Sequence, residues 1–234
     1  MYKLVIEDKE YSLPEDMYLD KWIALSKWSP IPTFYPQIIS LGMDIPIDKV
    51  DLMPDDVKEL AVTLIIALTS PDWKGVQRKY NGGELINLDE ITLGQFIDLE
   101  VSIQDSLYKN IKQIISVLYS GAEVKATTRL SEVWGAIKYY MQWRILLYSK
   151  YKNLFDIGGD SDEVVENKQD NNVNNAHIWY DIVMVLADNK FLNIDPVVNR
   201  PLIEALNWLA WNKDRIRKEQ NELQRHNQQA RNIS

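Results

Sequence analysis

The amino-acid sequence predicts a mainly α protein, a helical bundle around a long antiparallel helix pair, with a small N-terminal β-hairpin and a second, projecting β-hairpin. Apolar residues recur at steps of three and four through residues 91–155, which is the spacing of one helix face. Thr92 with Gln95 three positions later has the form of a capping box. In two short stretches apolar and polar residues alternate around turn-forming residues, and this pattern predicts the two hairpins.

Two long helices joined by a short turn are predicted for residues 91–155. The first apolar stripe consists of Leu93, Phe96, Ile97, Ile103, Leu107, Ile111, Ile114, Ile115 and Leu118. Gly121 is its expected end. The second consists of Val133, Trp134, Ile137, Met141, Ile145 and Tyr148. Further aromatic residues around the second helix indicate that it is central or covered by another chain.

Smaller elements precede this pair. Tyr2, Leu4 and Ile6 alternate with polar residues, so residues 2–13 predict a hairpin. Helices are expected at residues 17–27, from Pro36, and from Pro54 to about Leu68, because proline is favoured in the first turn of a helix.

The second hairpin is expected near residues 74–90, with its turn at Asn81 and Gly82, where positive φ is required. Two interpretations remain open. The hairpin either projects as a contact arm or lies flat on its own domain.

Three segments are predicted. Residues 1–155 form the helical core domain with both hairpins, and residues 156–175, acidic and rich in asparagine, form a linker. Residues 176–234 return to helical spacing and end in a locally basic stretch from Trp211. This tail offers little apolar surface, so we expect it to fray unless it docks on a neighbouring chain.

Composition excludes several classes of function. The chain has 234 residues, 46% of them hydrophobic, which allows a sizeable core. It has no cysteine, which excludes disulfides and thiolate metal sites. A net charge of -8 argues against a general nucleic-acid binder, because neutralising phosphates needs a basic face, and we expect no sequence-specific nucleic-acid partner. The longest apolar run, residues 60–68, is about half of a bilayer span, so we expect no membrane partner. Residues 1–6 alternate between polar and apolar types, so we expect no signal peptide.

No motif for chemistry emerges. The two histidines, His177 and His226, are far apart, and neither glycine pair fits a nucleotide-binding loop. Asp98 and Glu100 are interpreted as members of solvated helix faces. We therefore expect no enzyme activity, no catalytic residue, no cofactor and no metal.

The order of several motifs resembles that of helical proteins in the neck and tail modules of tailed bacteriophages. The relevant stretches are YSLPEDMYLDKWIALSKW, IISLGMDIPIDKV, ITLGQFIDLE, AIKYYMQWRILLY and the C-terminal WYDIVMVLADNKFLNIDPVVNRPLIEALNWLAWNKDRIRKE. They are similar to proteins of crAss-like and related Bacteroides phages and to baseplate or tail assembly factors of T4-like phages. The resemblance spans most of the chain and implies no active site.

This resemblance implies a structural subunit of the virion, a ring-forming neck or tail protein that is assembled in the host cytoplasm and binds copies of itself and other phage structural proteins. The alternative is a tail or baseplate assembly chaperone that binds a tape-measure or hub protein. The candidate interface residues are those of the second hairpin turn and the basic tail: Tyr80, Asn81, Gly82, Trp211, Arg215, Ile216, Arg217 and Leu223.

Overall fold

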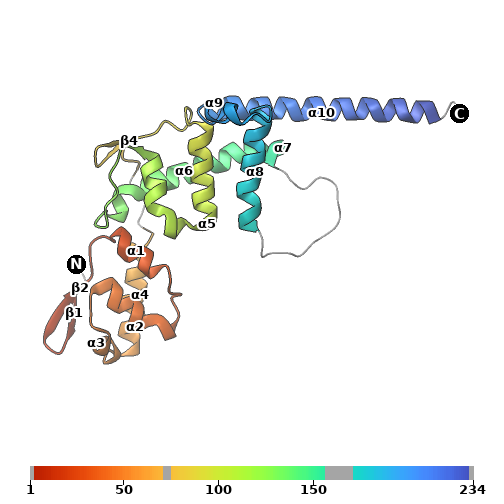
Figure 1. Ribbon diagram of the computed structural model, residues 1–234. Coiled ribbons are helices and arrows are strands. Elements are labelled where there is room, and N and C mark those ends of the chain that lie inside the picture. The colour runs from red at the N-terminus through yellow and green to blue at the C-terminus, as the bar shows by residue number, and fades with distance from the viewer. Residues whose placement is uncertain (1–2, 71–74, 156–170, 232–234) are drawn as a thin grey trace. The chain divides into compact units, whose positions relative to one another are not determined.

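A computed structural model describes residues 3–70, 75–155 and 171–231, with side chains in the last range from 178 to 225. Helices account for most of these residues, and the strands form two small antiparallel sheets, so the predicted fold class is confirmed (Figure 1). The predicted helix from Pro54 is α4 (Asp55–Leu68). The predicted N-terminal hairpin consists of β1 (Lys3–Ile6) and β2 (Lys9–Ser12).

The chain forms two compact units, and neither is continuous in sequence. Unit 1 contains Met1–Leu85 and Asp105–Tyr139, and unit 2 contains Ile86–Gln104 and Tyr140–Ser234. This division does not follow the expected segments 1–155, 156–175 and 176–234, because both long helices contribute residues to both units. Residues 156–170 of the expected linker lie outside the described residues, and residues 171–175 belong to a helix.

Unit 1 packs its helices around a core of apolar side chains. Its complete helices are α1 (Leu19–Leu25), η1 (Pro32–Phe34), α2 (Tyr35–Met43), α3 (Ile47–Asp51) and α4. Trp22 of α1 packs on aromatic rings from both long helices, since its ring lies 4.7 Å from that of Tyr108 and 5.7 Å from that of Trp134. Its indole Nε1 donates to the Thr69 carbonyl oxygen at 2.9 Å, so this buried tryptophan has its polar atom satisfied.

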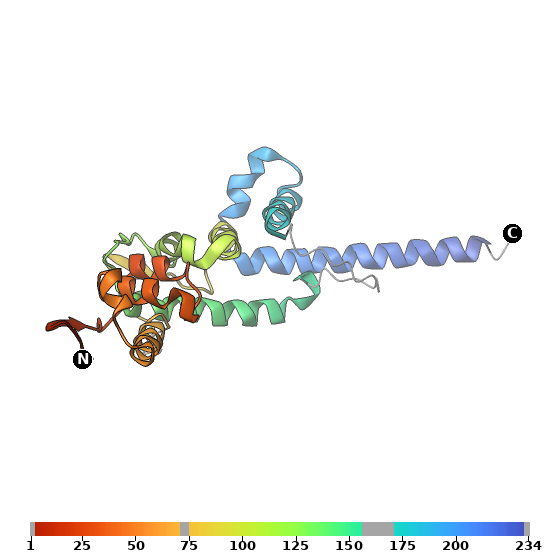
Figure 2. The same ribbon diagram turned by 90° about the horizontal axis from the view of Figure 1, so that it is seen from below.

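The second hairpin lies against its own unit, which is the flat alternative of the two interpretations. Its strands β3 (Lys79–Tyr80) and β4 (Gly83–Leu85) join β5 (Tyr119–Ser120) in a sheet of order β3-β4-β5. The Tyr80 hydroxyl bonds that of Thr128, and the Asn81 amide donates to the Glu123 carbonyl. The N-terminal hairpin lies at the edge of unit 1 (Figures 1 and 2), and its Glu7 forms an ion pair with Lys49 of α3.

The first long helix, α5 (Leu93–Leu118), is interrupted at Ser106, whose backbone is extended with φ -175° and ψ 119°. The Ser106 Oγ accepts from the Lys109 amide at 3.3 Å, so this serine caps the second helical segment. The first member of the expected pair is therefore two helical segments, one in each unit. The apolar period continues across the break, which is why the sequence pattern did not reveal it.

Unit 2 combines the first segment of α5 with the second half of α6 (Leu130–Lys150), and with α7 (Lys152–Phe155), α8 (Asn171–Leu186), η2 (Phe191–Asn193), α9 (Ile194–Val198) and α10 (Leu202–Arg231). Aromatic residues fill its centre. The Phe96 ring lies 6.3 Å from that of Trp143 and 5.4 Å from that of Trp179.

The C-terminal tail is helical through Arg231, in contrast to the expected frayed arm. It continues α10 beyond the other helices of unit 2 (Figures 1 and 2). Good helix formers and close pairs of opposite charge support this exposed length, as with Arg215 and Glu219 at 3.2 Å.

One arrangement of helix starts occurs in both units. In unit 1, Leu19 N donates to the Thr128 carbonyl and Leu130 N to that of Met17. In unit 2, Leu93 N donates to the Arg200 carbonyl and Leu202 N to that of Ile91. Each pair of bonds ties the first turns of two helices together, α1 with α6 and α5 with α10.

The hairpins that precede α1 and α5 match as well. A single offset in numbering, the one that separates Leu19 from Leu93, carries the first hairpin onto the second. It places the pairs Val5–Glu10 and Ile6–Lys9 on Lys79–Glu84 and Tyr80–Gly83. It also places the turn residues Glu7 and Asp8, with φ 47° and 64°, on Asn81 and Gly82, with φ 41° and 85°. The chain thus contains a repeated hairpin–helix motif.

Candidate functional site: an apolar groove beside a buried ion pair

Unit 2 contains a cavity of about 690 Å³, here called the groove. Its walls come from α5, α6, α7, α8 and α10, and most of the lining is apolar. The lining residues are Gln104, Arg144, Tyr148, Leu154, Phe155, Ile178, Trp179, Ile182, Leu206, Leu209, Asn212, Lys213, Ile216, Arg217 and Gln220. The residues from α10 recur at steps of three and four, so one face of this helix forms one wall. This volume lies in the range of ligand pockets, roughly 300–1,000 Å³.

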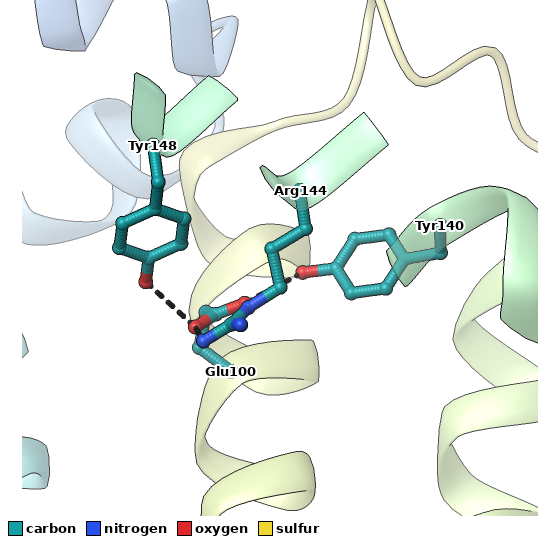
Figure 3. A network of polar contacts seen from close by, with 4 residues as sticks. All are labelled: Glu100, Tyr140, Arg144 and Tyr148. Carbon is teal, nitrogen blue, oxygen red and sulfur yellow. Dashed lines mark hydrogen bonds and ion pairs between the residues drawn. The ribbon is translucent and has the colours of Figure 1, made fainter. Parts of the chain in front are cut away.

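A fully buried carboxylate, Glu100, binds two of the residues that line the groove, Arg144 and Tyr148. Figure 3 shows this cluster. Arg144 donates from Nε to Oε1 at 2.5 Å and from Nη2 to Oε2 at 2.7 Å. Two phenols complete the cluster, since the Tyr140 hydroxyl donates to Oε1 at 3.0 Å and the Tyr148 hydroxyl to Oε2 at 2.7 Å. Each carboxylate oxygen therefore accepts two hydrogen bonds, which compensates the burial of its charge.

Local sequence explains how these groups meet. Tyr140, Arg144 and Tyr148 are spaced four apart on α6, so their side chains lie along one helix face. The start of α5 is fixed by the predicted capping box, in which Gln95 N donates to Thr92 Oγ1 at 3.2 Å and Thr92 N to Gln95 Oε1 at 3.1 Å. That anchor sets the phase of the helix that carries Glu100.

Arg144, Tyr140 and Tyr148 keep their protonation states near neutral pH. The hydrogen bond to Glu100 raises the pKa of the Arg144 guanidinium, against the desolvation that lowers it. Burial, followed by the Glu100 charge, raises the pKa of both Tyr140 and Tyr148 above the ordinary tyrosine value. The guanidinium stays charged and both phenols stay protonated. The arrangement can therefore orient and rigidify a wall of the groove, while its apolar lining can accept apolar side chains.

The predicted interface residues fall into two groups that belong to different units. Tyr80, Asn81 and Gly82 lie in unit 1, at the turn of the docked second hairpin. The others lie along α10. Of these predicted residues, Ile216 and Arg217 line the groove. The remaining members, Trp211, Arg215 and Leu223, are exposed on the same helix, with the Arg215 guanidinium 5.5 Å from the centre of the Trp211 ring.

Sequence reasoning missed the residue at the centre of this site. Glu100 was assigned to a solvated face, yet it has no exposed surface. A signal was present on the other helix, because Arg144 interrupts an otherwise apolar stretch and stands between two tyrosines at helical spacing. Charged residues are rarely buried without a partner, so such an arginine indicates a carboxylate facing it.

Among the side chains of residues 3–70, 75–155 and 178–225, no group of three or more histidine, cysteine, aspartate or glutamate residues is placed to hold a metal ion. None of the helices in these ranges is both long and apolar enough to cross a membrane. The side chains of His177 and His226 lie outside the part of the chain described at that level.

The chain matches no protein-family model, no curated protein and no solved structure. Fold and site together define its class as a mainly α protein with an apolar groove beside a buried ion pair.

Proposed function

We propose that this protein is non-enzymatic and acts through protein–protein interfaces. The observation that carries the proposal is the exposure of large apolar side chains on the helices of unit 2. Leu192 is 87% exposed and Phe191 77%, and on α6 Leu146 is 70% and Ile145 65% exposed. These are two pairs of neighbouring apolar residues, and large exposed apolar surface is typical of sites that another protein covers.

The most exposed pair adjoins a turn that hydrogen bonds define. Phe191 and Leu192 follow a tight turn in which Lys190 N donates to the Ala187 carbonyl at 3.0 Å. The Asn193 side chain donates to that same carbonyl at 3.1 Å. Since these bonds fix the turn, exposure of the two side chains is a property of the fold, and a partner would bind them with little ordering cost.

The particular role we propose is a structural subunit of a tailed-phage virion, a ring-forming protein of the neck or tail. The sequence resemblance supports this role. The arrangement of surfaces on unit 2 also favours it, because the four exposed apolar side chains described above are not among the residues that line the groove. Distinct surfaces of this kind favour head-to-tail contacts, which close into rings when the rotation permits.

The alternative role is a tail or baseplate assembly chaperone. The groove favours it, since a cavity of about 690 Å³ with apolar walls suits a segment of a tape-measure or hub protein. A chaperone would leave before the particle is complete, whereas a ring subunit would remain in it.

Mass spectrometry of purified particles and of assembly intermediates separates the two roles. We expect the chain in finished particles at a fixed copy number. Its presence in intermediates alone would indicate the chaperone, and its absence from both would contradict the proposal.

The Phe191→Ser/Leu192→Ser variant should lose incorporation, while Leu52→Ser, which alters an exposed leucine of unit 1, should be incorporated normally.

A further inference from the structure

The two matching hairpins differ in one respect. In the second, β4 pairs on one side with β3 and on the other with β5, through Glu84–Ser120 and Leu85–Tyr119. In the first, β2 pairs with β1 alone among the described strands. The offset that superposes the hairpins places Glu10 and Tyr11 on Glu84 and Leu85. The edge of β2 that corresponds to the β5-binding edge of β4 thus has no paired strand among the described residues, and Glu10 on it is exposed.

The backbone groups at this edge can be assigned. Leu85 N donates to the Arg78 carbonyl at 2.8 Å, so the backbone of Leu85 points towards the first strand of its hairpin. Neighbouring residues of a strand point in opposite directions, and Glu84 therefore directs its N–H and C=O towards Ser120. By the matching register, Glu10 directs the same two groups away from β1. These groups are a template for one more antiparallel strand.

We propose that the outer edge of β2 accepts an extended strand from a different protein, which completes a three-stranded sheet like that of β3, β4 and β5. The inference rests on the proposed role in protein–protein contact and specifies one partner surface. The partner strand would place a small polar residue opposite Glu10 and an aromatic residue opposite Tyr11, as Ser120 and Tyr119 do opposite Glu84 and Leu85. Main-chain hydrogen bonds would supply most of the recognition.

The first hairpin is built to present this edge. It lies at the edge of unit 1 (Figures 1 and 2), where an ion pair between Glu7 and Lys49 of α3 holds its turn and Glu10 is exposed. Lys3 and Glu10 pair at 2.6 Å across the two strands. The matching Glu84 pairs with Lys79 at 2.9 Å and still accepts β5, so a glutamate here is compatible with a third strand.

The test uses the full chain, labelled with ¹⁵N, and a synthetic peptide of residues 115–124, the segment that contains β5. Titration followed by NMR should shift the amide signals of β2, with Glu10 and Ser12 most affected. A peptide with Ser120→Pro should have no effect, because proline removes the N–H that Ser120 offers to the pairing strand. Dilution of the peptide-free protein should leave the β2 signals unchanged.

Two protein variants separate the edges of the hairpin. Glu10→Pro removes the outward N–H of β2 and keeps the bonds between β1 and β2, so it should abolish the shifts. Val5→Pro removes the outward N–H of β1, on the opposite edge, and should bind the peptide as the wild type does. Unchanged signals of α1 would show that both variants keep the fold of unit 1.

Several results would overturn the assignment. One is the absence of any shift of the β2 signals at the highest soluble peptide concentration. Another is that the Ser120→Pro peptide causes equal shifts, and a third is that the Glu10→Pro variant still binds the peptide. Concentration-dependent β2 signals without peptide would identify a second copy as the strand donor and exclude the different protein. None of these results bears on whether the chain is found in particles, so this inference and the proposed function can fail separately.

Discussion

Arg144 and Glu100, one on each long helix, form a two-pronged ion pair inside unit 2, and the carboxylate has no exposed surface while the arginine side chain is 27% exposed. A buried charge that keeps its partner contributes little net stability, but the loss of one partner leaves the other uncompensated. This asymmetry makes the pair a sensitive probe of the site.

We expect Arg144→Met to destabilise the protein by roughly 3–5 kcal/mol, because Glu100 would remain buried without its cation. The double variant Glu100→Leu/Arg144→Met should recover most of this loss. Arg200→Met serves as the control, since Arg200 forms an exposed pair with Glu204 and its removal should cost about 0.5 kcal/mol or less. Chemical denaturation measures all three, and equal losses for Arg144→Met and Arg200→Met would contradict the buried pair.

Two isoleucines on α6 provide a second comparison. Ile137 is 2% exposed and Ile145 is 65% exposed. Ile137→Asp places a charge in the core of unit 1 and should cost about 4 kcal/mol or more, whereas Ile145→Asp should change stability by less than about 1 kcal/mol. Thermal unfolding followed by circular dichroism distinguishes them. A Ile137→Asp variant that melts like the wild type would disprove the assigned core.

Alkaline pH should unfold the protein. Burial raises the pKa of Tyr119 to about 12, and burial with the Glu100 charge raises the pKa of Tyr140 and Tyr148. In the unfolded chain these phenols ionise near pH 10, so above that pH the unfolded state binds fewer protons and the free energy of unfolding falls. This contribution is fully present below about pH 10.

Denaturation at a series of pH values measures the slope. Tyr140→Phe and Tyr148→Phe should each make the decrease above pH 10 less steep, because phenylalanine has no proton to lose. Tyr180→Phe, at a tyrosine that is 54% exposed, is the control. Equal slopes for all variants would contradict the burial of these phenols.

The end of α10 should matter for assembly more than for folding. Its side chains from Lys213 to Arg225 are exposed, so deletion of residues 221–234 should change the free energy of unfolding by less than about 1 kcal/mol. Particle assembly should be impaired, because Leu223 and the basic residues of this stretch would be lost. Normal assembly of the truncated protein would refute a contact role for the tail.

The sequence by itself determined the helices and the first hairpin, because these depend on local signals. The three–four spacing of apolar residues, the capping box at Thr92 and Gln95 and the proline before α4 act over a few residues, and each is found where it was predicted. The predicted turn at Asn81 and Gly82 is likewise confirmed, since both residues adopt positive φ.

Only the tertiary structure decided how these elements combine. Ser106 interrupts α5, although the apolar spacing of the sequence continues through this residue. The division into two units depends on contacts between residues that are distant in sequence. The match between the hairpins rests on backbone register, with few identical side chains beyond Glu10 with Glu84 and Leu19 with Leu93. The site shows the same dependence, because Glu100 resembles any helical glutamate until α6 brings Arg144 and two phenols to it. Local patterns specify each helix, but the energy of burying a charge depends on partners that the chain supplies from elsewhere.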